Sequence, residues 1–143
     1  MRQLIFCLCF LILNCNGLYA KENALTDLKI LPLPNNRLRI DFQFADEVKQ
    51  SPASFITEKP QRLVLDFIDS SNQLDAAARQ KTLKLGSVQN YQVVSVGKRV
   101  RVMFNLSAAI TYSGFKSGHA YTLLINGVGK ELIPRPHELY VTH

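Results

Sequence analysis

Arginine occurs in three short segments of this 143-residue sequence, at alternate positions in two of them. Together with the acid and the amide that accompany it, the set consists of Arg37, Arg39, Arg62, Asp66, Arg99, Arg101 and Asn105. The guanidinium group is a planar fork of donors that matches a carboxylate, and Asp and Asn side chains bond sugar hydroxyls and peptide amides. This combination predicts a surface that binds a polymer carrying carboxylates and sugars. The alternative is an ordinary solvated sheet face on which Arg and Asp form minor cross-strand pairs.

No set of residues in the sequence has the spacing that catalysis requires. All three cysteines lie within the first 15 residues, and the three histidines, His119, His137 and His143, are isolated from one another. A zinc site would need ligands at close spacing, and a dinucleotide site would need a third glycine after residues 127–129. We therefore expect a protein that is not an enzyme and that holds neither a metal nor a cofactor.

The first 20 residues have the order of a secretory signal peptide. Arg2 is followed by an apolar run over residues 4–13 and then by small and polar residues up to Ala20. The run is about half the roughly 20 residues that a membrane-spanning helix needs, so we expect cleavage after Ala20 and no stable membrane span. An uncleaved anchor is the alternative. Cleavage would remove every cysteine, which predicts an exported, disulfide-free protein of the periplasm.

Basic residues outnumber acidic residues after this segment. Without Arg2, the chain has 16 Lys and Arg against 11 Asp and Glu, which gives a net charge of +5. A basic protein is expected to bind an anionic partner. Because an exported protein rarely meets nucleic acid, we expect no nucleic-acid partner and retain cell-wall polymer, anionic lipid headgroups and acidic protein surfaces.

Hydrophobic periodicity places the arginines on β-strands. Apolar and polar residues alternate over 37–44, 62–67 and 99–106, so the arginines of each segment point away from its apolar face. Further strands are expected at 28–33, 53–57, 87–96, 110–112 and 121–125, with a loop at 69–72 and one helical turn within 73–81. About seven or eight short strands predict an antiparallel β-sandwich or a small barrel. We expect this domain to span 21–128 and an extended linker or truncated tail to span 129–143.

Three segments resemble the AMIN domain. They are Gln61-Arg62-Leu63-Val64-Leu65-Asp66-Phe67, the strand from Gly97 to Leu106, and the closing residues 112–125, and the resemblance covers residues 24–126. It implies an antiparallel β-sandwich that binds peptidoglycan and so localises the protein that carries it. The family's two arginine-bearing strand motifs fall on Arg62 to Asp66 and on Arg101 to Leu106.

The residues after the signal peptide favour one branch of this family. AMIN domains occur in type IV pilus secretins and in periplasmic cell-wall amidases, and residues 23–28 are most similar to the secretin branch. The resemblance therefore implies a module that holds a secretin-like pilus assembly protein at the cell wall or outer membrane. The alternatives are the targeting domain of an amidase and an adaptor that docks on pilus or secretin components through a sheet edge. Because the sequence stops at His143, a truncated reading frame, a stand-alone adaptor and an excerpt of a longer chain all stay open.

Overall fold

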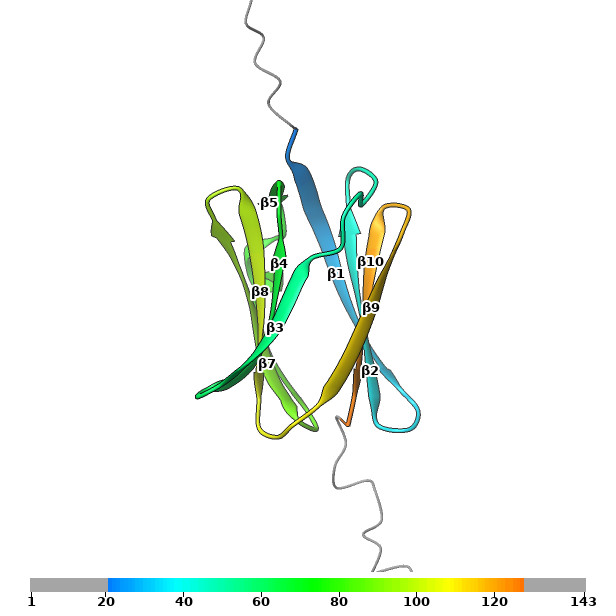
Figure 1. Cartoon of the computed structure of the whole chain (residues 1–143), viewed down its shortest axis with the longest axis vertical. Helices are drawn as coiled ribbons and strands as arrows, with labels where there is room; N and C mark the ends of the chain where they lie inside the picture. Colours follow the sequence, from blue (N-terminus) through cyan, green and yellow to red (C-terminus); the bar gives the residue numbers. More distant parts are fainter. Residues whose placement is uncertain (1–20, 128–143) are drawn as a thin grey trace, which may run out of the picture.

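Two β-sheets pack face to face in the computed structural model, which describes residues 21–127 (Figure 1). Sheet A has the strand order β5-β1-β2-β10-β9, and sheet B has the order β3-β4-β8-β7-β6. The elements are β1 (Asn23–Leu33), β2 (Arg37–Phe44), β3 (Ala53–Glu58), β4 (Gln61–Phe67), β5 (Ser70–Asn72), the 3-10 turn η1 (Ala76–Ala78), β6 (Gln80–Leu85), β7 (Val88–Val96), β8 (Arg99–Leu106), β9 (Thr111–Ser117) and β10 (Ala120–Asn126). The expected fold class, an antiparallel β-sandwich, is confirmed. The expected signal peptide over 1–20 and the tail over 129–143 lie outside the described residues.

A tight turn joins the first two strands of sheet A. Asn35 and Asn36 have φ angles of 64° and 57°, a left-handed conformation that asparagine adopts more readily than most residues. The turn sets an antiparallel register in which Leu33 lies opposite Arg37. β2 pairs with β10 on its other side, so it lies in the middle of sheet A.

The inner faces of the two sheets form one hydrophobic core. The alternating apolar residues of β2 are Leu38, Ile40, Phe42 and Phe44, and none is more than 3% exposed. The ring centroid of Phe67, from β4 in the opposite sheet, lies 5.1 Å from those of both Phe42 and Phe44. Burial contributes about 1.5–3 kcal/mol for each large apolar side chain. The packing of the two sheets against each other is therefore the main source of stability.

The sequence pattern misses two strands. Residues 69–72, expected as a loop, contain β5, which pairs in parallel with Asn23–Leu25 of β1. The expected helical turn is confirmed at Ala76–Ala78, but β6 follows it directly and pairs with β7. β5 has three residues, and β6 loses its register between Thr82 and Leu85. Neither segment therefore shows the unbroken alternation by which a strand is recognised.

Membrane-spanning helices are absent from the part of the chain that the structure describes. Over residues 21–127, no helix has the length and apolar character needed to cross a bilayer. The single helical element in that range is the three-residue turn η1.

Candidate functional site

The seven candidate residues lie on two opposite faces of the molecule. β2 belongs to sheet A, whereas β4 and β8 pair with each other in sheet B. Arg37 and Arg39 therefore lie on the outer face of sheet A. The outer face of sheet B carries the other five, which are Arg62, Asp66, Arg99, Arg101 and Asn105. The expectation of one shared arginine surface is wrong, because alternation fixes the side of a strand on which a residue lies but not the sheet that the strand joins.

A polar row crosses three strands on the outer face of sheet B. Arg62 of β4 lies opposite Asn105 of β8, which lies opposite Asn90 of β7. The Nε of Arg62 donates a hydrogen bond of 2.7 Å to Oδ1 of Asn105, and Nδ2 of Asn105 donates to Oδ1 of Asn90. The Nη groups of Arg62 have no partner among residues 21–127. The two amides thus orient the guanidinium group and leave most of its donors available to a ligand.

A second polar row lies four residues further along β4. The Nε and Nη2 of Arg101 donate hydrogen bonds of 2.8 and 2.9 Å to the two carboxylate oxygens of Asp66. These bonds lower the pKa of Asp66, although burial acts in the opposite direction, and the charges of Arg101 and Arg99 lower it further. The same carboxylate raises the pKa of Arg101. Both side chains are therefore charged at neutral pH, and the pair holds the Arg101 guanidinium in a fixed orientation.

An apolar row separates the two polar rows. Phe55 of the edge strand β3 lies opposite Val64, and Val64 lies opposite Met103 of β8. Phe55 is 43% exposed, whereas Val64 is 4% exposed. Successive side chains on one face of a strand are about 7 Å apart. The apolar strip formed by Phe55, Val64 and Met103 therefore lies about 7 Å from the Arg62 row on one side and from the Arg101 row on the other. Sequence reasoning missed Phe55, because the register between β3 and β4 decides its neighbours and no local pattern reveals that register.

The outer face of sheet A carries a smaller network. The Nε of Arg39 donates hydrogen bonds of 3.0 and 3.2 Å to the carboxylate oxygens of Asp41, and the hydroxyl of Thr122 donates one of 2.9 Å to the same group. A depression of about 310 Å³ lies beside these residues. The Nε of Arg37 donates to the carbonyl oxygen of Pro34 at 3.2 Å and so stabilises the turn before β2.

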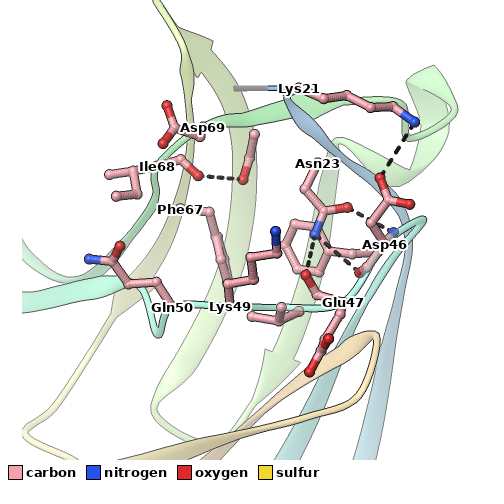
Figure 2. A pocket seen from close by; sticks show the side chains of 12 residues that line it. Lys21, Asn23, Asp46, Glu47, Lys49, Gln50, Phe67, Ile68 and Asp69 are labelled. Atoms are coloured by element: carbon pink, nitrogen blue, oxygen red, sulfur yellow. Dashed lines mark hydrogen bonds and ion pairs between the residues drawn. The ribbon is translucent and has the colours of Figure 1, made fainter. Parts of the chain in front are cut away.

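A larger pocket, of about 650 Å³, lies at one end of the sandwich (Figure 2). Its walls come from the start of β1, from the segment between β2 and β3, and from the turn between β4 and β5. The aromatic rings of Phe44 and Phe67 and the side chain of Val48 form its apolar part. Sequence reasoning missed this pocket as well, because the three segments that form it are far apart in the chain.

Metal ligands do not gather anywhere in the described region. Residues 21–127 contain no group of three or more His, Cys, Asp or Glu side chains that could hold a metal ion. His119 lies in the turn between β9 and β10, where its carbonyl oxygen accepts a hydrogen bond of 2.8 Å from the N–H of Phe44. The outer surfaces present hydrogen-bond donors, charges and apolar side chains.

The fold and these surfaces define the class of protein, a two-sheet β-sandwich that presents an ordered polar face. The chain belongs to the AMIN domain family, whose profile matches residues 27–128. It is 32% identical over 89 residues to the fimbrial assembly protein PilQ of Pseudomonas aeruginosa, and this alignment covers 62% of the chain and 12% of that protein. It is 28% identical over 111 residues to the type IV pilus biogenesis and competence protein PilQ of Neisseria gonorrhoeae, covering 75% of the chain and 14% of that protein. The aligned region thus spans 12 to 14% of the length of these two relatives.

Proposed function

We propose that this chain is a peptidoglycan-binding module of a type IV pilus secretin-like assembly protein, which it holds at the cell wall in the periplasm. Membership of the AMIN family supports the choice of peptidoglycan. The similarity to the PilQ proteins of Pseudomonas and Neisseria supports the link to pilus assembly. The role is one of binding without catalysis, and it requires neither a metal nor a cofactor. The module comprises residues 21–128, between a signal peptide over 1–20 and a tail over 129–143.

The observation that carries this proposal is the pair of oriented guanidinium groups on the outer face of sheet B. Asn105 orients Arg62, and Asp66 orients Arg101 through two hydrogen bonds. A side chain that is already fixed loses little conformational entropy when it binds a ligand, so each bond to the ligand contributes more to affinity. Arg99, the first residue of β8, is exposed and adds a third positive charge on the strand that carries Arg101.

The order of the rows matches the chemistry of a peptide-bearing glycan. The guanidinium groups of Arg62 and Arg101 offer planar donors to the carboxylates of the stem peptides. The apolar strip of Phe55 and Met103 lies between them and can pack against the apolar face of a sugar ring, while Asn90 and Asn105 can bond hydroxyl and amide groups. A polymer laid across the sheet would therefore meet polar, apolar and polar side chains in turn.

Retention on isolated sacculi tests this function. We expect the purified protein to pellet with sacculi and the double variant Arg62→Glu with Arg99→Glu to stay in the supernatant. These two positions are chosen because, within residues 21–127, neither arginine forms an ion pair with a carboxylate, so the change removes none of the hydrogen bonds between Asp66 and Arg101. Charge reversal at Arg101 would instead place an acid beside the Asp66 carboxylate, whose side chain is only 8% exposed, and destabilise the fold.

The matched control changes the net charge by the same amount on the opposite face. Lys29→Glu with Arg37→Glu alters the outer face of sheet A, since Lys29 lies opposite Asp41 in the register of β1 and β2. We expect this control to pellet with sacculi nearly as well as the wild type. Equal retention of both double variants, with circular dichroism spectra like that of the wild type, would remove the outer face of sheet B from the proposed site.

The exposed edge of sheet B favours a second candidate function, docking of a protein partner. Among the strands of residues 21–127, β3 pairs only with β4, and Phe55 and Ile56 are 43% and 38% exposed. An extended segment of a pilus or secretin component could add a strand to this edge, since edge strands carry unpaired backbone groups. Photo-cross-linking in cells from a probe at position 56 separates the two candidates. Protein adducts from cells, combined with no retention on sacculi, would favour docking over wall binding.

A further inference from the structure

The end pocket is a preorganised cavity that is separate from the outer face of sheet B. It lies at one end of the sandwich, and none of the residues that we propose for wall binding lines it. Its volume of about 650 Å³ is in the range of small-molecule sites, which is about 300–1,000 Å³. The rings of Phe44 and Phe67 form part of its wall and are each 3% exposed.

Hydrogen bonds from three directions fix the segment that forms one wall of the pocket. The Nδ2 of Asn23 donates to the carbonyl oxygens of Asp46 and Glu47 at 3.1 and 3.3 Å, and its Oδ1 accepts from the N–H of Asp46 at 2.9 Å (Figure 2). The N–H of Val48 donates to the carbonyl oxygen of Gly118 at 2.9 Å. The Nζ of Lys116 donates to the carbonyl oxygen of Lys49 at 2.7 Å. This wall is therefore held in place before any ligand arrives.

Three charges at this pocket, those of Glu47, Lys49 and Asp69, have no partner within the described residues. The Lys21 ammonium pairs with the Asp46 carboxylate at 3.7 Å. No interaction of the Lys49 ammonium, the Asp69 carboxylate or the Glu47 carboxylate occurs among residues 21–127. Figure 2 shows the Lys49 side chain running along Phe67 with its ammonium toward the interior of the pocket, and Asp69 beyond Phe67 in the same view.

We propose that the end pocket binds the zwitterionic end of an aliphatic diamino acid, with its carboxylate at Lys49, its ammonium at Asp69 and its methylene stem on Phe67 and Ile68. A ligand with both charges pairs with Lys49 and with Asp69, whereas a simple anion would meet the repulsion of the Asp69 and Glu47 carboxylates. Ile68 is 41% exposed at the pocket and adds apolar surface beside the ring of Phe67. This inference rests on the proposed function, because the diamino acid of an un-cross-linked wall stem peptide ends in this way.

Chemical-shift mapping with a soluble peptide tests the pocket without sacculi. The probe is the tripeptide L-alanyl-γ-D-glutamyl-meso-diaminopimelate, added to the ¹⁵N-labelled protein. We expect the largest shifts at the amides of residues 46–50 and 68–70. Acetylating the free amine of the diaminopimelate or amidating the carboxyl group next to that amine should each weaken binding by about fivefold, the upper range for an exposed charge pair. Shifts confined to sheet B, or equal binding of all three peptides, would overturn the inference.

Single substitutions at the two charges provide the matched protein test. Lys49→Gln and Asp69→Asn should each weaken binding of the tripeptide by about fivefold. Asparagine is suitable at position 69 because Asp69 has a φ of 47°, which asparagine tolerates. Lys59→Gln, in the turn between β3 and β4, is the control for the loss of one positive charge and should bind like the wild type. Unchanged affinity in both pocket variants would also overturn the inference.

The outcomes for the pocket and for the wall-binding face are distinguishable. The double variant Arg62→Glu with Arg99→Glu should keep the tripeptide shifts at the pocket while it loses retention on sacculi. If the tripeptide binds at the pocket but the wild type is not retained on sacculi, the proposed wall-binding function is refuted and the inference about the pocket stands. If the wild type is retained on sacculi but the tripeptide causes no shifts at the pocket, the inference about the pocket is refuted and the proposed function stands.

Discussion

Replacement of Asp66 by asparagine probes the ion pair that orients the proposed binding face. The Asp66 side chain is 8% exposed and that of Arg101 is 34% exposed, so the pair is intermediate between a buried and a surface ion pair. Removing one partner of a buried pair costs about 3–5 kcal/mol, whereas a surface pair contributes about 0.2–1 kcal/mol. Because Arg101 can turn toward water once Asp66 is gone, we expect Asp66→Asn to lower the free energy of unfolding by about 2 kcal/mol.

The pH dependence of this loss has a definite sign. The pKa of Asp66 in the folded protein lies below 3.8, its ordinary value, so the unfolded state takes up the proton first as the pH falls. The contribution of the charged carboxylate is complete above about pH 5 and is lost as the pH falls through the pKa of the folded state. The difference between wild type and Asp66→Asn should therefore be constant near neutral pH and shrink below pH 3.8.

Urea unfolding measures both effects. The chain has five Tyr and no Trp, so tyrosine fluorescence and far-ultraviolet circular dichroism are the suitable probes. Asp41→Asn is the control, because the Arg39–Asp41 pair is more exposed, at 44% and 22% for the two side chains, and its loss should cost no more than about 1 kcal/mol. Equal costs for the two variants at pH 7, or a cost of Asp66→Asn that does not change between pH 6 and pH 3, would refute the reasoning.

Substitutions at three further positions test the fold around the two sites. Gly114→Ala should lower the free energy of unfolding in urea by about 1–3 kcal/mol, because the added Cβ would lie 2.0 Å from the hydroxyl of Tyr121, which is 6% exposed. An unchanged free energy of unfolding would mean that the Tyr121 side chain moves freely. Asn36→Val should cost about 1–2 kcal/mol and Asn36→Gly much less, since only the β-branched residue is strained at a φ of 57°; equal midpoints in thermal melts would contradict this. Asn23→Ala should speed hydrogen exchange at the Asp46 amide, which the Asn23 side chain binds, while exchange in the core strands stays unchanged; unchanged protection of that amide would show that other bonds hold the segment.

The local sequence pattern was sufficient to predict the central strands β2 and β8 and the turn between β1 and β2. The alternation over 37–44 and 99–106 coincides with β2 and β8, and the two asparagines at 35 and 36 lie in the turn that joins β1 to β2. Alternation works at these places because each strand has one face in the core and one in water. It fails at β5, whose three residues form a strand only through parallel pairing with a distant segment.

The sequence by itself determined that the arginines would point away from the core, because the period of a strand separates the two faces of each segment. Only the tertiary structure decided that Arg37 and Arg39 lie on one sheet and that Arg62, Arg99 and Arg101 lie on the other. It also placed Phe55 beside Val64 and brought Lys49 and Asp69 to one pocket. The physical reason is that side-chain alternation is a property of neighbouring residues, whereas the order and register of strands depend on hydrogen bonds and packing between segments far apart in the chain.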